Sequence, residues 1–539
     1  MSNRLLAAAL MLLAVAPAFS QTTTGDVLGT VRDASGAAVA EAKVTVRNLE
    51  TNISRDTQSS SDGTFRVPLL PSGNYELIVE KSGFAKYIQR PITLRLNQQA
   101  DVSVSMQVAG TSETISVSAD APLINTTSAE ISTNFDTKRI SEVPFSPNRN
   151  IINLALNVPG VSQLSQGQQS FAAGGNTGTE TGATSFAVNG MRVRSNNFML
   201  DGQDVNDPSV TGLGQGLNNQ DLVAEFRVIT NQFNAEYGRA AGSVINIVTK
   251  SGTNAFHGSA FWFHNNQKLN ARNNQDEVLG VSDRRFQSAP FRIENQFGGT
   301  IGGPVVKDRT FFFGSLLRWT DRRLGSGSEI RGAPTEEGRQ LLQSIAGNQV
   351  TVRALLENLP AAQVPTGSSE TISFNGRSAL IPLGTLTGSS SIRFDNWQNS
   401  GRVDHKLTEK HMLGGRYLYD GAISNGTGQA TPQGLTSAIP TRRQSAMAFL
   451  NSTFTAGLFN EVRFGYSRFA SVTNASNPEI AERIPAIQVT SLGLTGFNAD
   501  ATRTGLGLAV NLPQYRRNNI YQIQDNLSII RGSHSIKAG

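Results

Sequence analysis

The second half of the chain consists of strand-like stretches whose connections alternate between long and short. These stretches fall near residues 256–264, 294–302, 310–320, 394–406, 412–419, 444–455, 461–469 and 519–530, and a ninth begins at about His534. The short connections read GPVVKDR, LTEKH, TAGLFN and RGS, and the long ones span about 265–292, 321–390, 421–443 and 470–517. If these stretches pair in sequence order as an antiparallel sheet, the short turns lie at one end of the strands and the long loops lie at the other.

The same stretches separate apolar from polar side chains. Val462, Phe464 and Tyr466 share one face of their stretch, and Glu461 and Arg463 share the other. A ten-residue strand tilted near 40° rises about 25 Å, the height of the apolar band of an outer-membrane barrel. We therefore predict an antiparallel transmembrane β-barrel with apolar faces toward lipid and polar faces toward the lumen. A soluble all-β protein is the alternative, but it gives no reason for the sorted loops.

The N-terminus predicts export. MSNRLLAAALMLLAVAPAFSQ carries Arg4, then an apolar run from Leu5 to Val15, then Ala18 and Ser20 placed for cleavage before Gln21. This order is typical of a secretory signal peptide. A membrane anchor is the alternative, but the run is too short to span a bilayer.

The region from Gly25 to about Met106 reads as short strands joined by turns. AKVTVRN alternates apolar and polar residues, and Asp62-Gly63 is a signal for a two-residue hairpin. Regular turns of this kind predict a small β-sandwich. Residues from about 120 to 250 mix short helices with strands, and Asp136 is placed to cap a short helix. The chain is thus mainly β, with an α+β middle region.

Composition argues against several kinds of function. The net charge of +6 comes from scattered basic residues, so nucleic-acid binding is not expected. The chain has no cysteine, and its five histidines form no HExxH pattern, so no metal site is expected. We find no G-x-S-x-G or confined carboxylate pair, so a secreted peptidase or glycosidase is poorly supported. We expect neither enzymatic activity nor a cofactor.

Two families are similar to parts of the chain. GTVRDASGAAVAEAKVTVRN and SDGTFRVPLLPSGNYELIVEKSGF resemble the carboxypeptidase regulatory-like, transthyretin-like sandwich, which implies a fold and no catalysis. FAVNGMRVRSNNFMLDGQDVND and NAEYGRAAGSVINIVTKSGTNAFHGSAF resemble the plug and plug-to-barrel junction of TonB-dependent outer-membrane transporters, of the Oar-like kind. The resemblance implies a barrel of twenty-two strands. The chain supplies about nine and ends inside a strand at SHSIKAG, so we expect a fragment of a longer protein.

The linker before the plug contains the strand-prone stretch SETISVSAD. The outer membrane has no ATP or ion gradient, so energy must arrive mechanically from a partner in the periplasm. An exposed strand suits this partner because it can add its backbone to the edge of the partner's sheet. The stretch resembles the TonB box of the family. The predicted partner-binding residues are Glu113, Thr114, Ile115, Ser116, Val117, Ser118 and Ala119. The alternative is one more strand of the sandwich.

The predicted function is active uptake by an outer-membrane transporter or receptor of a Gram-negative bacterium, gated by the plug. The predicted segments are a signal peptide (1–20), the sandwich (25–108), the linker (109–120), the plug (121–250) and the N-terminal part of the barrel (251–539). The partners are a TonB-type energy-transducing protein, outer-membrane lipid and an extracellular substrate, and the sandwich lies in the periplasm. The substrate stays open among siderophores, glycans, peptides and cobalamin. An adhesion, structural or polypeptide-export protein that uses the sandwich as its binding module is the alternative.

Overall fold

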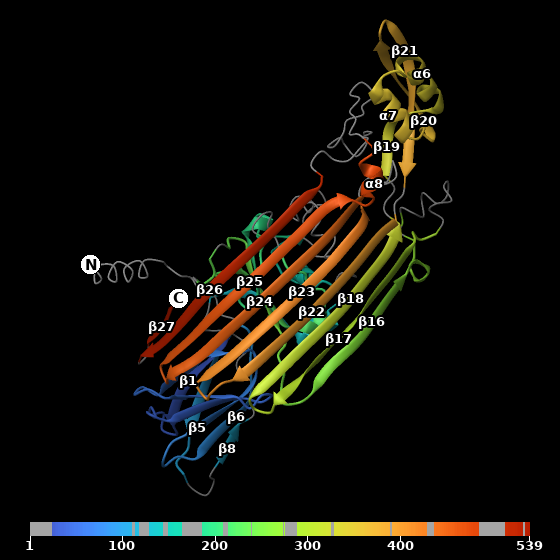
Figure 1. Cartoon of the computed structure of the whole chain (residues 1–539). Helices are drawn as coiled ribbons and strands as arrows, with labels where there is room; N and C mark the ends of the chain where they lie inside the picture. The colour runs from blue at the N-terminus through green and yellow to red at the C-terminus, as the bar shows by residue number, and fades with distance from the viewer. Residues whose placement is uncertain are drawn as a thin grey trace, which may run out of the picture.

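The chain forms a β-sandwich, an α+β plug, a nine-stranded sheet and a small outer module (Figure 1). The computed structural model describes residues 24–109, 114–117, 129–143, 149–163, 186–207, 214–234, 236–238, 240–272, 274, 288–324, 328–388, 391–427, 436–484, 512–531 and 534–539. The predicted signal peptide lies outside the described residues.

The N-terminal sandwich packs a three-stranded sheet, in the order β4-β1-β7, against a five-stranded sheet, in the order β3-β2-β5-β6-β8. Its strands are β1 (Gly25–Asp33), β2 (Lys43–Asn48), β3 (Ser54–Gln58), β4 (Thr64–Leu70), β5 (Gly73–Glu80), β6 (Lys86–Leu94), β7 (Gln99–Met106) and β8 (Thr114–Val117). Alternate residues point between the sheets: Val44 and Val46 of β2 are fully buried there with Val79 of β5.

The turn at Asp62-Gly63 differs from the predicted hairpin. β3 before the turn pairs with β2, whereas β4 after it pairs with β1 in the other sheet. The turn is fixed by the Asp62 carboxylate, which accepts hydrogen bonds from the backbone N–H (3.1 Å) and hydroxyl (2.7 Å) of Thr64. The hairpin prediction is wrong because turn chemistry sets a change of direction but not the partner of the next strand.

The plug is built on a five-stranded mixed sheet in the order β13-β12-β15-β14-β9. Its elements are β9 (Ile131–Asp136), α2 (Thr137–Glu142), η1 (Ile151–Asn157), β10 (Val161–Gln163), β11 (Phe186–Val188), η2 (Val193–Ser195), β12 (Asn196–Leu200), β13 (Gln203–Asp204), η3 (Gln220–Leu222), β14 (Val223–Asn231) and β15 (Ser243–Thr249). The predicted cap is confirmed: the Asp136 carboxylate accepts a hydrogen bond from the Arg139 N–H at 2.9 Å. The core of the plug includes Phe226 and Ile245, together with Phe313 and Leu418 from the nine-stranded sheet.

The nine-stranded sheet is antiparallel throughout and follows the chain in the order β16-β17-β18-β22-β23-β24-β25-β26-β27. Its elements are β16 (His257–Asn266), η4 (Gln267–Leu269), β17 (Arg292–Val306), β18 (Thr310–Leu324), β22 (Ser391–Lys406), β23 (His411–Thr427), β24 (Ser437–Thr455), β25 (Leu458–Ala475), β26 (Gln514–Arg531) and β27 (His534–Ala538). Each predicted strand-like stretch lies in one of these strands, apart from Phe256, which precedes β16. The strands extend beyond the predicted stretches, to 19 residues in β24.

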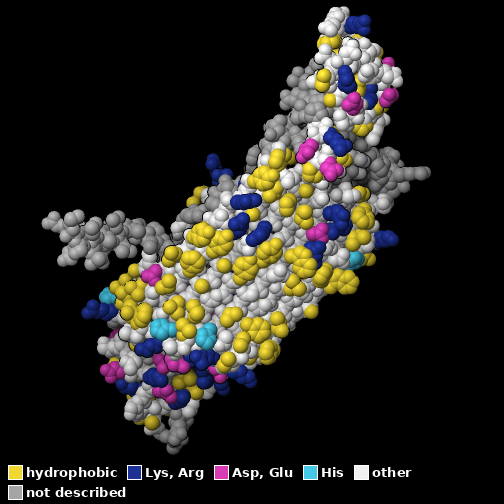
Figure 2. Space-filling model, in the orientation of Figure 1, with side chains coloured by type: hydrophobic (Ala, Val, Ile, Leu, Met, Phe, Trp, Pro, Cys, Tyr) yellow, Lys and Arg dark blue, Asp and Glu magenta, His cyan; other side chains and the backbone are white. Residues whose placement is uncertain are grey.

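The two faces of this sheet differ as the alternation predicts. In β25, Glu461 and Arg463 are each 2% exposed, whereas Val462 and Phe464 are 42% and 49% exposed. The buried polar face packs against the plug, and the other face carries the exposed apolar side chains seen along the strands in Figure 2. We call the two faces the inner and the outer face. The fold is thus a partial antiparallel transmembrane β-barrel around a plug.

The long connection predicted at 321–390 contains a folded module. It consists of β19 (Ser328–Pro334), α6 (Glu336–Ala346), α7 (Val350–Asn358), β20 (Val364–Phe374) and β21 (Arg377–Gly388), with the sheet order β19-β21-β20. Leu342, Leu355 and Ile381 share its core with Ala481 of α8 (Pro478–Ala481), which belongs to the connection after β25. None of the helices in the described part of the chain is long and apolar enough to cross a membrane.

The sandwich and the module lie at opposite ends of the nine-stranded sheet (Figure 1). The sandwich contacts the short turns. Asn52 donates a hydrogen bond to Asp308 in the β17–β18 turn (2.9 Å), and Thr57 donates one to the Ala456 carbonyl in the β24–β25 turn (3.0 Å).

Candidate functional site

The predicted partner-binding segment is only partly described. Residues 114–117 form β8, which pairs in parallel with β6 from Lys86↔Thr114 to Gln89↔Val117. Glu113, Ser118 and Ala119 lie outside the described residues. β8 is therefore a strand of the sandwich in this structure, which is the alternative that the sequence analysis left open. Its recognition by a partner stays a prediction.

β8 ends the order of the five-stranded sheet, so one of its two edges faces no further strand in the described part of that sheet. Thr114 and Ser116 are exposed, and Val117 packs against the apolar core of the sandwich. A four-residue strand at a sheet edge is held by few backbone hydrogen bonds. β8 can therefore be released, or extended by an added strand, at low cost.

A buried carboxylate makes one of the contacts between the plug and the inner face of the sheet. Asp201 follows β12, and its carboxylate accepts hydrogen bonds from the backbone N–H (2.8 Å) and hydroxyl (3.0 Å) of Thr249 at the end of β15. Its Oδ2 atom lies 2.8 Å from Nε of Arg416 on β23, and its Oδ1 atom lies 3.7 Å from Nη1 of Arg402 on β22. The ends of two plug strands thus bring this carboxylate to two arginines of the nine-stranded sheet, which we call the barrel wall.

Neighbouring acids balance the arginines around Asp201. Arg402 forms a bidentate pair with Asp404, at 2.8 and 3.1 Å, and Nη2 of Arg463 donates to Glu461 at 2.6 Å. We call these three arginines and three acids the Asp201 cluster: Arg402, Arg416, Arg463, Asp201, Asp404 and Glu461. Removing one member of a buried charge network leaves its partner uncompensated, which costs about 3–5 kcal/mol.

The residues after Asp201 continue this contact along the wall. Gly202 has φ +78°, and a Cβ atom there would lie 1.8 Å from Nη1 of Arg463. Gln203 donates a hydrogen bond to Ser467 at 2.8 Å and accepts one from Ser445 at 2.8 Å. The Asp204 backbone exchanges two hydrogen bonds with the Gln522 side chain, at 3.1 and 2.8 Å. The segment Asp201–Asp204 therefore joins the plug to five consecutive strands of the sheet, β22 to β26.

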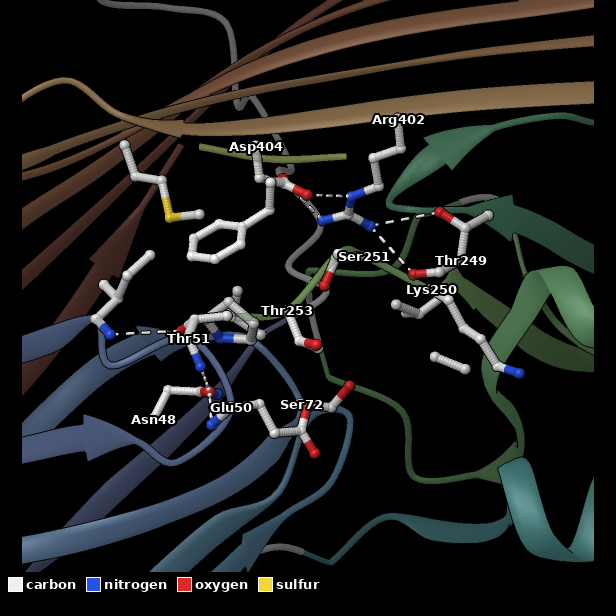
Figure 3. Close-up of a pocket in the computed structure, with 18 of the residues that line it drawn as sticks. Asn48, Glu50, Thr51, Ser72, Thr249, Lys250, Ser251, Thr253, Arg402 and Asp404 are labelled. Atoms are coloured by element: carbon white, nitrogen blue, oxygen red, sulfur yellow. Dashed lines mark hydrogen bonds and ion pairs between the residues drawn. The ribbon is translucent and has the colours of Figure 1, made fainter. Parts of the chain in front are cut away.

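A cavity of about 530 Å³ lies between the sandwich, the plug and the barrel wall. Asn48, Thr51 and Ser72 of the sandwich line one side of it, and Arg402 and Asp404 of the wall line the opposite side (Figure 3). Members of the Asp201 cluster therefore border a hollow space that the sandwich covers from the short-turn end.

The turn between β6 and β7 makes one of the contacts between the sandwich and the plug. The N–H of Leu96, between β6 and β7, donates to both oxygens of Glu225, at 3.0 and 2.9 Å, and its carbonyl accepts a hydrogen bond from Arg227. Arg227 also pairs with Glu130 at 3.0 Å. Burial raises the pKa of Glu225 and of Glu130 above the ordinary carboxyl value, although their hydrogen bonds and Arg227 oppose this shift.

Sequence reasoning did not single out the Asp201 cluster. Asp201 and Arg402 are two hundred residues apart, so no local pattern joins them. The signal that points to Asp201 is a carboxylate between an apolar strand and a glycine, in the stretch MLDGQ. The signal in the wall is an arginine and an acid spaced by two residues on the polar face of a strand, as in Arg402–Asp404 and Glu461–Arg463.

Two families match the chain. Residues 248–539, more than half of the chain, match the family described as outer membrane beta barrel domain. Residues 26–107 match the family described as carboxypeptidase regulatory-like domain. These ranges correspond to the nine-stranded sheet with its module and to the sandwich.

Among curated relatives, the chain is 28% identical over 301 residues to the TonB-dependent transporter Oar of Myxococcus xanthus, and the match covers 55% of this chain and 26% of Oar. Similar solved structures include the outer membrane transporter YddB from Escherichia coli, with 12% identity, a TM-score of 0.48 and coverage of 75% of this chain and 47% of YddB. The siderophore receptor PirA from Acinetobacter baumannii has 14% identity, a TM-score of 0.43 and coverage of 74% of this chain and 45% of PirA. The chain thus spans about a quarter of the length of Oar. Transporters and receptors of this kind are not enzymes. The chain belongs to the outer membrane beta barrel domain family, carries an N-terminal carboxypeptidase regulatory-like domain and is similar to the TonB-dependent transporter Oar.

Proposed function

We propose that the protein takes up an extracellular substrate across the outer membrane, with the plug as the gate and a TonB-type partner as the source of energy. The observation that carries this proposal is the plug packed on the inner face and held there by the Asp201 cluster. A plug bound in a lumen blocks passage, so uptake requires the plug to move. A pull from the periplasmic side is the means available in a membrane without ATP.

We propose that the sandwich lies in the periplasm and the module outside the cell. The short turns of outer-membrane barrels face the periplasm, and the sandwich contacts two of these turns, at Asp308 and Ala456. The signal peptide at residues 1–20 would export the chain to this location. The substrate would then meet the long connections, the module and the far side of the plug. An adhesion protein that uses the sandwich as an exposed binding module is less well supported, because the sandwich covers the plug.

The segment Glu113–Ala119 is the proposed site of partner binding. Strand addition needs an edge strand, and β8 is one. Since β8 is paired with β6, a partner that replaces β6 must first release β8 from the sandwich. The pull would then pass along the linker to the plug, whose first described strand, β9, pairs with β14 next to the contact of Glu225 with Leu96.

Deletion of Glu113–Ala119 from the full-length protein tests the partner assignment. We expect the purified periplasmic domain of the TonB-type partner to bind the wild-type protein and to lose binding to the deletion variant. Replacing seven residues beyond this segment, Ala121–Thr127, by a Gly/Ser sequence of equal length is the matched control and should leave binding intact. Unchanged binding of the partner to the deletion variant would refute the assignment.

A disulfide trap tests whether β8 must leave the sandwich. Ile88 and Ser116 are register partners in the parallel pair β6–β8, and the chain has no cysteine of its own. Adjacent strands lie about 4.8 Å apart, which is within reach of a disulfide. In the variant Ile88→Cys/Ser116→Cys we expect oxidation to weaken partner binding at least tenfold and reduction to restore it. Ile88→Cys alone is the control, and equal binding before and after oxidation would contradict release of β8.

A further inference from the structure

Six arginines point outward from the barrel wall in its half nearer the module. They are Arg318, Arg322, Arg393, Arg442, Arg468 and Arg517, and we call them the outer arginines. Arg318, Arg442 and Arg517 belong to one register row, which runs through Trp397, Gly421 and Ala470. Directly paired residues share a face of the sheet, and Trp397 is 45% exposed, so this row lies on the outer face. Figure 2 shows Lys and Arg side chains among the apolar ones in this part of the strand surface.

The outer face changes character along the strands. Closer to the sandwich it is apolar and aromatic, with exposed Val403, Phe464, Tyr521 and Ile523. The height of each arginine above the short-turn end of its strand follows from about 3.4 Å per residue and a tilt near 40°. Arg318 and Arg468 lie at a height of about 20–25 Å, and the other four arginines lie at about 30–35 Å. An apolar band about 25 Å tall therefore ends at the level of the outer arginines. Trp397 and Tyr515, which are also exposed here, are of the kind found at membrane interfaces.

The protein itself neutralises only part of this charge. Asp395 pairs with Arg318 at 2.5 Å and with Arg322 at 2.9 Å. Arg393, Arg442, Arg468 and Arg517 have no ion pair with any residue in the described part of the chain, and Arg393, Arg442 and Arg517 are exposed. An arginine on the lipid-facing side of a barrel destabilises the protein by about 2–4 kcal/mol at the bilayer midplane and by about 0–1 kcal/mol near the interface. The height of the outer arginines therefore fits a contact with lipid headgroups.

Guanidinium groups bind phosphate through paired, charge-assisted hydrogen bonds. We propose that the outer arginines bind the phosphate groups of a phosphorylated lipid in the leaflet farther from the sandwich. With the orientation proposed above, on which this assignment of the leaflet rests, that is the outer leaflet of the outer membrane. The phosphate groups of the lipid pair with the arginines that have no acidic partner in the protein. The acyl chains of the lipid contact Trp397 and the apolar part of the outer face that lies closer to the sandwich.

The test compares phosphorylated and dephosphorylated lipid on the purified full chain in detergent. The probe is bis-phosphorylated lipid A, titrated by native mass spectrometry, with fully dephosphorylated lipid A as its chemical control. We expect the wild-type protein to bind the phosphorylated form at least tenfold more tightly. Arg393→Gln/Arg442→Gln/Arg517→Gln should lose this preference, and Arg517→Gln alone should weaken binding about threefold.

The matched control removes three exposed charges at the other end of the barrel wall, as Lys307→Gln/Arg309→Gln/Lys410→Gln, and should bind like the wild type. A triple outer variant that melts like the wild type and binds with unchanged affinity would overturn the proposal. Displacement of the lipid by excess inorganic phosphate would also overturn it, because the site would then be one for a free anion. The assay includes neither the TonB-type partner nor a transport substrate, so its failure is distinct from failure of the proposed uptake function.

Discussion

The plug is held on two sides by contacts of different kinds. On the barrel side, the Asp201 cluster joins side chain to side chain, with three arginines against three acids. On the sandwich side, the plug residues Glu225 and Arg227 form hydrogen bonds with the backbone N–H and carbonyl of Leu96. The first contact depends on the identity of every member, whereas the hydrogen bonds to Leu96 depend on the position of the turn that carries it.

The proposed function requires a plug that is both secure and movable, and this difference between the two contacts would account for both. Buried charge pairs hold strongly in one geometry and are costly to separate in low dielectric, so the Asp201 cluster fixes the plug in one place. Hydrogen bonds with the backbone of a turn open when that turn moves. A force applied through the linker would therefore meet the sandwich contact first and the Asp201 cluster last.

Asp201→Ala should have the largest effect and would test whether the barrel contact is electrostatic. Arg402 and Arg416 would lose their shared carboxylate, and Thr249 would lose the acceptor of its N–H. We expect the plug to lose about 3–5 kcal/mol of stability against the wall, seen as faster trypsin cleavage of the plug in detergent and a lower melting temperature. Glu142→Gln, an exposed substitution in α2, is the control. A plug equally resistant to trypsin in both variants would remove the distinction between the two contacts.

Gly202→Ala should have the second largest effect. Gly202 and Gly190 both have positive φ, +78° and +74°, but only at Gly202 would the added Cβ meet a neighbour, Nη1 of Arg463 at 1.8 Å. We expect about 1–2 kcal/mol of destabilisation for Gly190→Ala from φ alone, and about 2–4 kcal/mol for Gly202→Ala, because Arg463 must also leave Glu461. Thermal melting of the two variants measures the difference. Equal losses would show that Arg463 moves aside freely.

These contacts also mark the limit of what the sequence predicts. The strands of the wall follow from the alternation of residues such as Glu461 to Tyr466, and the Asp136 cap follows from the residues next to it, because both signals are local. The pairing of Asp201 with Arg402 and Arg416 is not local, and depends on where the plug stops against the wall. The module at 328–388 was missed because its strands and helices lie inside what the loop pattern marks as one connection.

The segment Thr114–Val117 shows the same limit from the other direction. Its alternation predicts a strand, and it is one, but alternation does not say which sheet receives it. The hairpin predicted at Asp62-Gly63 was wrong for the same reason, since β4 pairs with β1 and not with β3. Local chemistry thus predicts the elements of this chain well, and the partners of its short strands poorly.

Glu225→Gln should have the smallest effect and would sharpen the account of the sandwich contact. Burial raises the pKa of Glu225, so the ionised form is the disfavoured one in the folded protein. A raised carboxyl pKa contributes stability that is fully present below the unfolded value and is lost as pH rises through the folded value. The contact with Leu96 should therefore be tighter at pH near 5 than near 8. The neutral Gln side chain still accepts the Leu96 N–H, so the variant should hold the turn with little pH dependence.

Hydrogen exchange at the Leu96 amide measures this contact, as a protection factor corrected for the intrinsic rate at each pH. The groups that face Glu225 are Arg227, Asn134, Ser72 and the Leu96 N–H itself. Arg227 also pairs with Glu130, whose pKa is raised by burial too, so the part of the pH dependence that Glu225→Gln removes is the part that belongs to Glu225. Glu41→Gln, an exposed substitution in the sandwich, should keep the wild-type pH dependence. If protection in the wild type instead rises with pH, the ionised carboxylate must stabilise the turn more than its burial costs, and the sandwich contact would then be electrostatic like the contact at Asp201.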